Sequence, residues 1–165
     1  MSAQYKLIHF TLNGKETERM VDVRASLTDM LRNDYRLTSV KKGCEVGECG
    51  ACNVLIDGEA FNSCIYLAIW AEGKSVETLE GLLTPEGRLS DLQQAFIDET
   101  AIQCGFCTPG FIMTAVEILN TKKLYSDDEL RKLLSGHLCR CTGYENILRA
   151  VKKTMYRRLG KEIDF

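Results

Sequence analysis

Eight cysteines constrain this chain more than any other feature, because 165 residues must accommodate all of their sulfur atoms. The opening residues, Met-Ser-Ala-Gln-Tyr-Lys, have no charged segment followed by an apolar run, so no secretory signal is expected. We therefore expect a cytoplasmic protein, and the cytoplasm keeps thiols reduced and disfavours disulfides. Bound metal is the explanation that this count favours, with scattered core cysteines and disulfides as alternatives for the spacing to decide.

The overall composition argues against two classes of partner. Hydrophobic residues make up 45% of the chain, which is ordinary for a globular protein. The 21 Lys and Arg residues are balanced by 23 Asp and Glu residues, and no basic stripe interleaved with aromatic residues is present, so no nucleic acid is expected. The longest apolar run, Cys64 to Ala71, is far shorter than the roughly 20 residues that cross a bilayer, so no membrane insertion is expected.

The first half of the chain alternates between apolar and polar residues as strands do. Asn13-Gly14 and Asp57-Gly58 are two-residue turns that predict β-hairpins. Leu27, Met30 and Leu31 follow Ser26 at helical spacing. The predicted strands are 6–12, 18–23, 53–56, 59–61 and 75–79, and the predicted helix is 27–33. This order indicates a small β-grasp-like module.

The second half repeats its apolar residues every three or four positions, which predicts helices over 90–100, 109–120, 127–134 and 144–159. Pro109 suits a first helical turn, and Ser126 with Glu129 forms a capping box. Four helices with short connections predict a small bundle. The chain is thus expected to be an α+β protein with domains 1–82 and 83–165, joined by a linker over 81–87.

The first cysteine set is Cys44-Glu-Val-Gly-Glu-Cys49-Gly-Ala-Cys52, followed by Cys64. This spacing matches the plant-type [2Fe-2S] ferredoxin pattern, although the last gap is short. Glycines at 43, 47 and 50 let the loop curl so that backbone N–H groups point at an anionic cluster. A zinc loop is the alternative, but zinc sites favour Cys-x2-Cys knuckles over a four-residue gap.

The second cysteine set is Cys104-Gly-Phe-Cys107 with Cys139-Arg-Cys141, and its spacing alone leaves the metal open. A redox dithiol, a structural zinc site and a cluster are all compatible with it. Each pair stands before a predicted helix, whose N-terminus would direct positive charge at an anionic centre. Arg140 could do the same or be a solvated side chain, whereas His137 needs no role, because four thiolates complete a site.

Taken together, the motifs resemble the iron-sulfur subunit of the molybdenum hydroxylases, the family of xanthine dehydrogenase and aldehyde oxidoreductase. The resemblance extends from about residue 5 to 157, and Gln103 to Gly110 and Leu138 to Tyr144 match the family pattern without a break. It implies one [2Fe-2S] cluster in a ferredoxin-like N-terminal domain and a second in a four-helix C-terminal domain.

The resemblance also assigns residues and partners. It implies that the first cluster is held by Cys44, Cys49, Cys52 and Cys64, and the second by Cys104, Cys107, Cys139 and Cys141. Gln103 and Cys141 would contact a molybdopterin cofactor held by a large partner subunit. Electrons would pass to a flavin, expected on an FAD-binding medium subunit, or to an external acceptor. A polar residue without such a contact is the alternative for Gln103.

The implied function is an electron-transfer subunit of an oxidoreductase complex, with no catalytic residue and no substrate site on this chain. Among the family's branches we favour purine or xanthine oxidation, on the stretch Cys64-Ile-Tyr-Leu-Ala-Ile-Trp-Ala-Glu-Gly-Lys74. The same subunit could serve a nicotinate, aldehyde, carbon monoxide or aromatic acyl-CoA enzyme. A free-standing ferredoxin carrier and a zinc-binding interaction module are the rivals from other classes.

Overall fold

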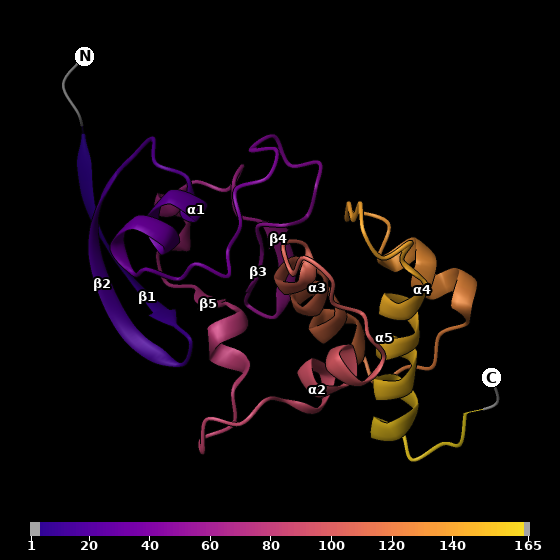
Figure 1. Ribbon diagram of the computed structural model, residues 1–165. Coiled ribbons are helices and arrows are strands. Elements are labelled where there is room, and N and C mark those ends of the chain that lie inside the picture. The colour runs from indigo at the N-terminus through magenta and orange to yellow at the C-terminus, as the bar shows by residue number, and fades with distance from the viewer. Residues whose placement is uncertain (1–3, 164–165) are drawn as a thin grey trace.

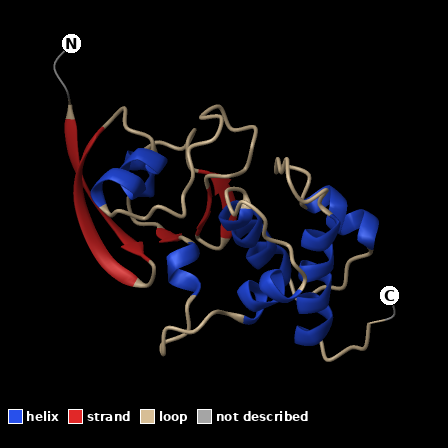
Figure 2. Ribbon diagram, in the orientation of Figure 1, coloured by secondary structure: helices blue, strands red, loops and turns tan. Residues whose placement is uncertain are grey.

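A computed structural model describes residues 4–163 and places the strands in the first half of the chain and the longer helices in the second (Figures 1 and 2). One five-stranded sheet has the order β2-β1-β5-β3-β4. Its strands are β1 (Tyr5–Leu12), β2 (Lys15–Asp22), β3 (Asn53–Ile56), β4 (Glu59–Asn62) and β5 (Ser75–Glu77). β1 and β5 are parallel, and the remaining neighbours are antiparallel, so the sheet is mixed.

Both predicted hairpins are present. Asn13 and Gly14 have positive φ angles of 50° and 77°, the backbone that a two-residue turn requires, and Leu12 pairs with Lys15 across it. β2 begins three residues before the predicted strand 18–23, because pairing with β1 runs unbroken to this turn. Ile8, Phe10 and Leu12 alternate toward the interior, which fixes the register of the pair.

The helix predicted over 27–33 begins as expected but changes its geometry. Ser26 caps α1 (Leu27–Asp29) by accepting a hydrogen bond from the Asp29 backbone N–H at 3.0 Å. The backbone then widens into a π-helix, η1 (Met30–Asp34). Short 3-10 helices follow later at η2 (Ala68–Ala71) and η3 (Leu79–Leu82), so that the strand predicted over 75–79 ends at residue 77.

The four helices predicted for the second half are present. They are α2 (Asp91–Asp98), α3 (Thr108–Asn120), α4 (Asp127–Leu133) and α5 (Glu145–Arg158). Pro109 lies in the first turn of α3, and the Ser126 capping box forms as predicted; the structure adds a second capping box, between Ser90 and Gln93. Tyr144, predicted as the first helical residue, instead precedes α5 in a left-handed conformation with φ of 70°.

The two halves have separate hydrophobic cores. The first core lies under the sheet and is centred on Ile8, Leu27, Leu31, Val54 and Val76. The second lies among the helices and is centred on Leu92, Phe96, Phe111, Leu130 and Ile147. The domain ranges 1–82 and 83–165 stay a prediction, and their outermost residues, 1–3 and 164–165, lie outside the described part of the chain.

Helix α3 joins the halves by packing against β3 and β4 (Figure 1). This contact places the N-terminal turn of α3 beside the loop that carries the first cysteine set. Within residues 4–163, none of the helices has the length and apolar character needed to cross a bilayer.

Candidate metal centres

The first cysteine set comes together from the loop 43–52 and from Cys64, which follows β4. The Cys44 sulfur accepts hydrogen bonds from the backbone N–H groups of Val46 and Glu48, at 3.4 and 3.3 Å. The N–H of Val46, with smaller contributions from Glu48 and Cys49, lowers the pKa of the Cys44 thiol to about 6. The loop therefore stabilises negative charge on this sulfur, as a metal-binding thiolate requires.

The other side of this set is more enclosed. Burial, together with the adjacent Cys52 thiol, raises the pKa of Cys64 to about 11. A Cβ atom on Gly43 would lie 2.8 Å from the Cys49 sulfur, so the loop approaches that sulfur more closely than a side chain would permit. Cys44 and Cys49 interact with each other, as do Cys52 and Cys64, which gives two pairs of neighbouring sulfurs.

The second set gathers from the segments that precede α3 and α5. Cys107 precedes α3 directly as its N-cap residue, as the sequence predicts, whereas Cys141 is separated from α5 by the turn 142–144. The sulfurs of Cys104 and Cys141 lie 3.6 Å apart on an exposed face. Burial, with the neighbouring Cys139 thiol as the next cause, raises the pKa of Cys107 to about 12. This set too consists of two pairs, one exposed and one more enclosed.

The paired arrangement fits a two-iron group better than a single ion. In a [2Fe-2S] cluster each iron takes only two of the four cysteines, so pairs of sulfurs suffice. The donor chemistry, eight thiols in two separate groups, fits two such clusters.

The two cysteine sets meet across the contact between the halves. A Cβ atom on Gly110 in α3 would lie 2.1 Å from the Gly50 carbonyl oxygen, so two backbones approach here without an intervening side chain. The Leu138 backbone N–H donates to the Cys49 carbonyl oxygen at 3.1 Å. One hydrogen bond therefore links a cysteine of the first set to the residue before Cys139 in the second.

A buried polar group beside this link was missed by the sequence reasoning, which gave His137 no role. The imidazole is 3% exposed and stacks on Phe111, with ring centroids 4.4 Å apart. Its Nε2 shares a hydrogen bond of 2.8 Å with the Thr114 hydroxyl oxygen, which also accepts from the Asn53 side-chain amide at 3.0 Å. Burial lowers the pKa of His137 to about 4, so the ring packs between the halves in its neutral form.

Gln103 and Cys141, the two residues expected to contact a pterin, are both exposed. Apolar side chains flank them: Ile102 and Phe106 are 36% and 46% exposed, and Leu138 is 62% exposed. Arg140 is also exposed. The chain therefore exposes apolar side chains next in sequence to the second cysteine set and close in sequence to Gln103 and Cys141.

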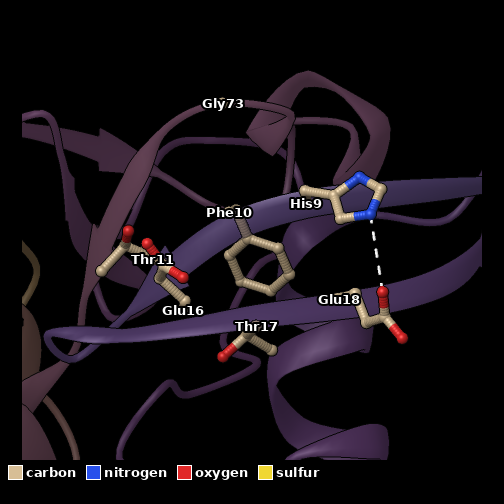
Figure 3. Close-up of a pocket in the computed structure, with 7 residues that line it drawn as sticks. All are labelled: His9, Phe10, Thr11, Glu16, Thr17, Glu18 and Gly73. Atoms are coloured by element: carbon tan, nitrogen blue, oxygen red, sulfur yellow. Dashed lines mark ion pairs between the residues drawn. The ribbon is translucent and has the colours of Figure 1, made fainter.

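A groove on the sheet half of the protein lies away from both cysteine sets. It has a volume of about 510 Å³ and runs along the β1–β2 hairpin (Figure 3). His9 lies there on the solvent side of the sheet, with its Nε2 atom 3.5 Å from a carboxylate oxygen of Glu18. His9 is an exposed residue of β1.

Comparison with known proteins assigns both halves. The family described as "2Fe-2S iron-sulfur cluster binding domain" matches residues 10–78, and the "[2Fe-2S] binding domain" family matches residues 78–152. The chain is 50% identical over 150 residues to the caffeine dehydrogenase subunit gamma of Pseudomonas sp. (strain CBB1), covering 88% of this chain and 89% of that protein. It is 49% identical to the xanthine dehydrogenase iron-sulfur-binding subunit of Escherichia coli O157:H7, with coverage of 87% and 91%.

Solved structures give the same result. A chain in the crystal structure of quinoline 2-oxidoreductase from Pseudomonas putida 86 superposes with a TM-score of 0.89 and 45% identity, covering 97% of this chain and 100% of that one. Aldehyde oxidoreductase from Desulfovibrio gigas has the same TM-score at 39% identity, and the match covers 95% of this chain and 18% of that longer one. The protein is an iron-sulfur protein with two [2Fe-2S] binding domains. It belongs to the iron-sulfur subunits of the molybdenum hydroxylases, the family of xanthine dehydrogenase and aldehyde oxidoreductase.

Proposed function

We propose that this chain relays single electrons from a molybdopterin centre to a flavin or an external acceptor. In this proposal Cys44, Cys49, Cys52 and Cys64 hold one [2Fe-2S] cluster, and Cys104, Cys107, Cys139 and Cys141 hold the other. The observation that carries it is the close approach of two cysteine sets across the Gly50–Gly110 contact, with the hydrogen bond from Leu138 to Cys49 between them. Two one-electron centres held this close suit a relay, and the chemistry at the substrate belongs to another subunit.

The expected partners are a molybdopterin-binding large subunit and an FAD-binding medium subunit. Support for the first comes from the exposed apolar side chains of Ile102 and Phe106 on either side of Gln103 and Cys104. A surface of this kind favours burial against another protein. In this arrangement Gln103 and Cys141 contact the pterin, with the large subunit covering the surrounding apolar side chains. Eight free cysteines suit a reducing compartment, so we propose that the complex works in the cytoplasm.

For the substrate, we propose a nitrogen heterocycle, with a purine such as xanthine as the specific hypothesis. Several relatives are named for nitrogen heterocycles. The caffeine dehydrogenase subunit is 50% identical, and the nicotine 6-hydroxylase small subunit from Paenarthrobacter nicotinovorans and the xanthine dehydrogenase subunit are each 49% identical. The aldehyde oxidoreductase subunit from Escherichia coli is less similar, at 40% identity. Assay of the purified complex with xanthine, nicotinate and an aldehyde tests this point, and turnover of the aldehyde alone would contradict it.

The electron-relay proposal is tested by metal analysis and paramagnetic resonance of the purified complex. Two clusters predict about four irons per chain and two distinct reduced signals. Cys49→Ser should remove one signal and leave the molybdenum centre undisturbed, whereas Cys141→Ser should perturb the other signal and the pterin environment. Zinc in place of iron at the second set, or identical spectra from the two variants, would contradict the proposal.

A further inference from the structure

The turn between Cys139 and α5 brings a hydroxyl against a cysteine sulfur. The Thr142 Oγ1 atom lies 3.1 Å from the Cys139 Sγ atom in a half-buried position. Of the eight cysteines in the described range 4–163, Cys139 is the one whose sulfur has a hydroxyl within hydrogen-bond distance. The backbone N–H groups near Cys44 give the first set a different kind of donor.

The direction of this hydrogen bond follows from the other partner of the hydroxyl. The Tyr144 backbone N–H donates to Thr142 Oγ1 at 3.2 Å, so that oxygen already accepts one hydrogen bond. An iron-bound thiolate has no proton to give and can only accept. The hydroxyl proton of Thr142 therefore points to Cys139 once iron is bound.

One further hydrogen bond and an unusual backbone angle shape the turn that carries the threonine. The Cys139 backbone N–H donates to the Tyr144 hydroxyl oxygen at 3.0 Å, which closes the turn on itself. Tyr144 adopts a φ of 70°, a conformation that non-glycine residues seldom take. Burial raises the pKa of Cys139, but the Thr142 hydroxyl and nearby backbone N–H groups outweigh it and hold that pKa below its ordinary value.

We propose that Thr142 is a positioning residue that tunes the second cluster, because its hydroxyl donates a hydrogen bond to the Cys139 thiolate and raises the reduction potential of that cluster. This inference rests on the proposed assignment of Cys139 as a ligand. Reduction adds one electron to the cluster and increases its negative charge, while the proton stays on Oγ1. A donor to a ligand sulfur stabilises the more negative state, so the electron favours this cluster more strongly than it would without Thr142.

The test is a redox titration of both reduced paramagnetic signals in the purified complex carrying Thr142→Val, with Thr142→Ser as the matched control. Valine keeps the branched shape and removes the donor, whereas serine keeps the hydroxyl. We expect Thr142→Val to lower the reduction potential of the second cluster. The expected shift is about tenfold in the equilibrium of one electron between the clusters, toward the first cluster, and this equals about 59 mV. The first cluster's own potential should not move, and Thr142→Ser should resemble the wild type.

Each other outcome contradicts the inference. An unchanged potential in a Thr142→Val complex with full iron content would exclude the hydrogen bond as a tuning element. Equal shifts in the valine and serine variants would assign the effect to packing. Loss of the second cluster in both Thr142→Val and Thr142→Ala would make Thr142 a structural cap of the turn instead. Failure of the relay proposal itself would appear separately, as wild-type complex lacking four irons or two signals.

Discussion

The contact between the two halves can be tested by adding one methyl group. Gly110 lies in the first turn of α3, and its φ is that of an ordinary helical residue, so Gly110→Ala introduces no backbone strain. The new Cβ atom would lie 2.1 Å from the Gly50 carbonyl oxygen and 3.1 Å from the Ala51 Cα atom. Close carbon-oxygen contacts in proteins begin at about 3.3 Å, so the helix and the loop must separate by roughly 1.2 Å.

The size of the effect follows from two opposing contributions. Overpacking costs about 1–3 kcal/mol in the free energy of unfolding. The cost here lies toward the upper end of this range, because the contacted backbone atoms cannot rotate away from the new methyl group. Alanine has a higher helix propensity than glycine, which stabilises the variant by about 1 kcal/mol and offsets part of this cost. The expected net loss is about 2 kcal/mol in the free energy of unfolding, which lowers the melting temperature by about 4–8 °C for a chain of this size.

Thermal unfolding and amide hydrogen exchange of the Leu138 N–H measure this change. That N–H donates to the Cys49 carbonyl oxygen at 3.1 Å, and a separation of roughly 1.2 Å would take it beyond hydrogen-bond range, so its exchange should accelerate. Gly136→Ala is the matched control, because a Cβ atom there meets nothing within 4 Å. Wild-type stability and unchanged Leu138 exchange in Gly110→Ala would refute the close approach of the two backbones.

Two further predictions concern stability. His137 has a pKa of about 4 when folded against 6.5 when exposed, so the unfolded chain binds its proton first and stability falls as pH decreases from 6.5 to about 4. The change in the free energy of unfolding across this pH range is on the order of 3 kcal/mol. In His137→Asn, the free energy of unfolding measured with denaturant should depend less on pH over the same range. An equally steep pH profile would contradict the buried neutral ring. Ser126→Ala should cost about 1 kcal/mol by removing the cap of α4, measured by thermal unfolding. Glu129→Gln is its control, since glutamine also completes a capping box, and equal losses in both variants would contradict this role.

Much of the fold could be predicted because its signals are local. Asn13-Gly14 specifies a turn through two positive φ angles, and the capping box at Ser126 specifies where α4 begins. The boundaries that differed depend on more distant contacts. β2 extends to residue 15 because β1 pairs with it along its whole length, and α5 begins after Tyr144 because that residue closes the cysteine turn.

The cysteine sets were identifiable from spacing, whereas the residues that join them were not. His137 and Thr114 are 23 positions apart, and Asn53 is 61 positions from Thr114, so no local pattern links them. One signal was present in the sequence, because the glycines at 50 and 110 each stand within three residues of a cysteine. Only the folded chain shows that these two glycines touch.

The position of this contact favours a single two-cluster unit over a free-standing ferredoxin domain. Gly50 directly follows Cys49, and Gly110 lies three residues after Cys107, so the two backbones meet beside a candidate ligand of each set. A separated first half would lose the Leu138 hydrogen bond and leave the Asn53 amide without Thr114. Because these hydrogen bonds form only while the halves are in contact, each half stabilises the cysteine loop of the other. The distance between the two proposed clusters is therefore set by the same backbone contact that holds the halves together.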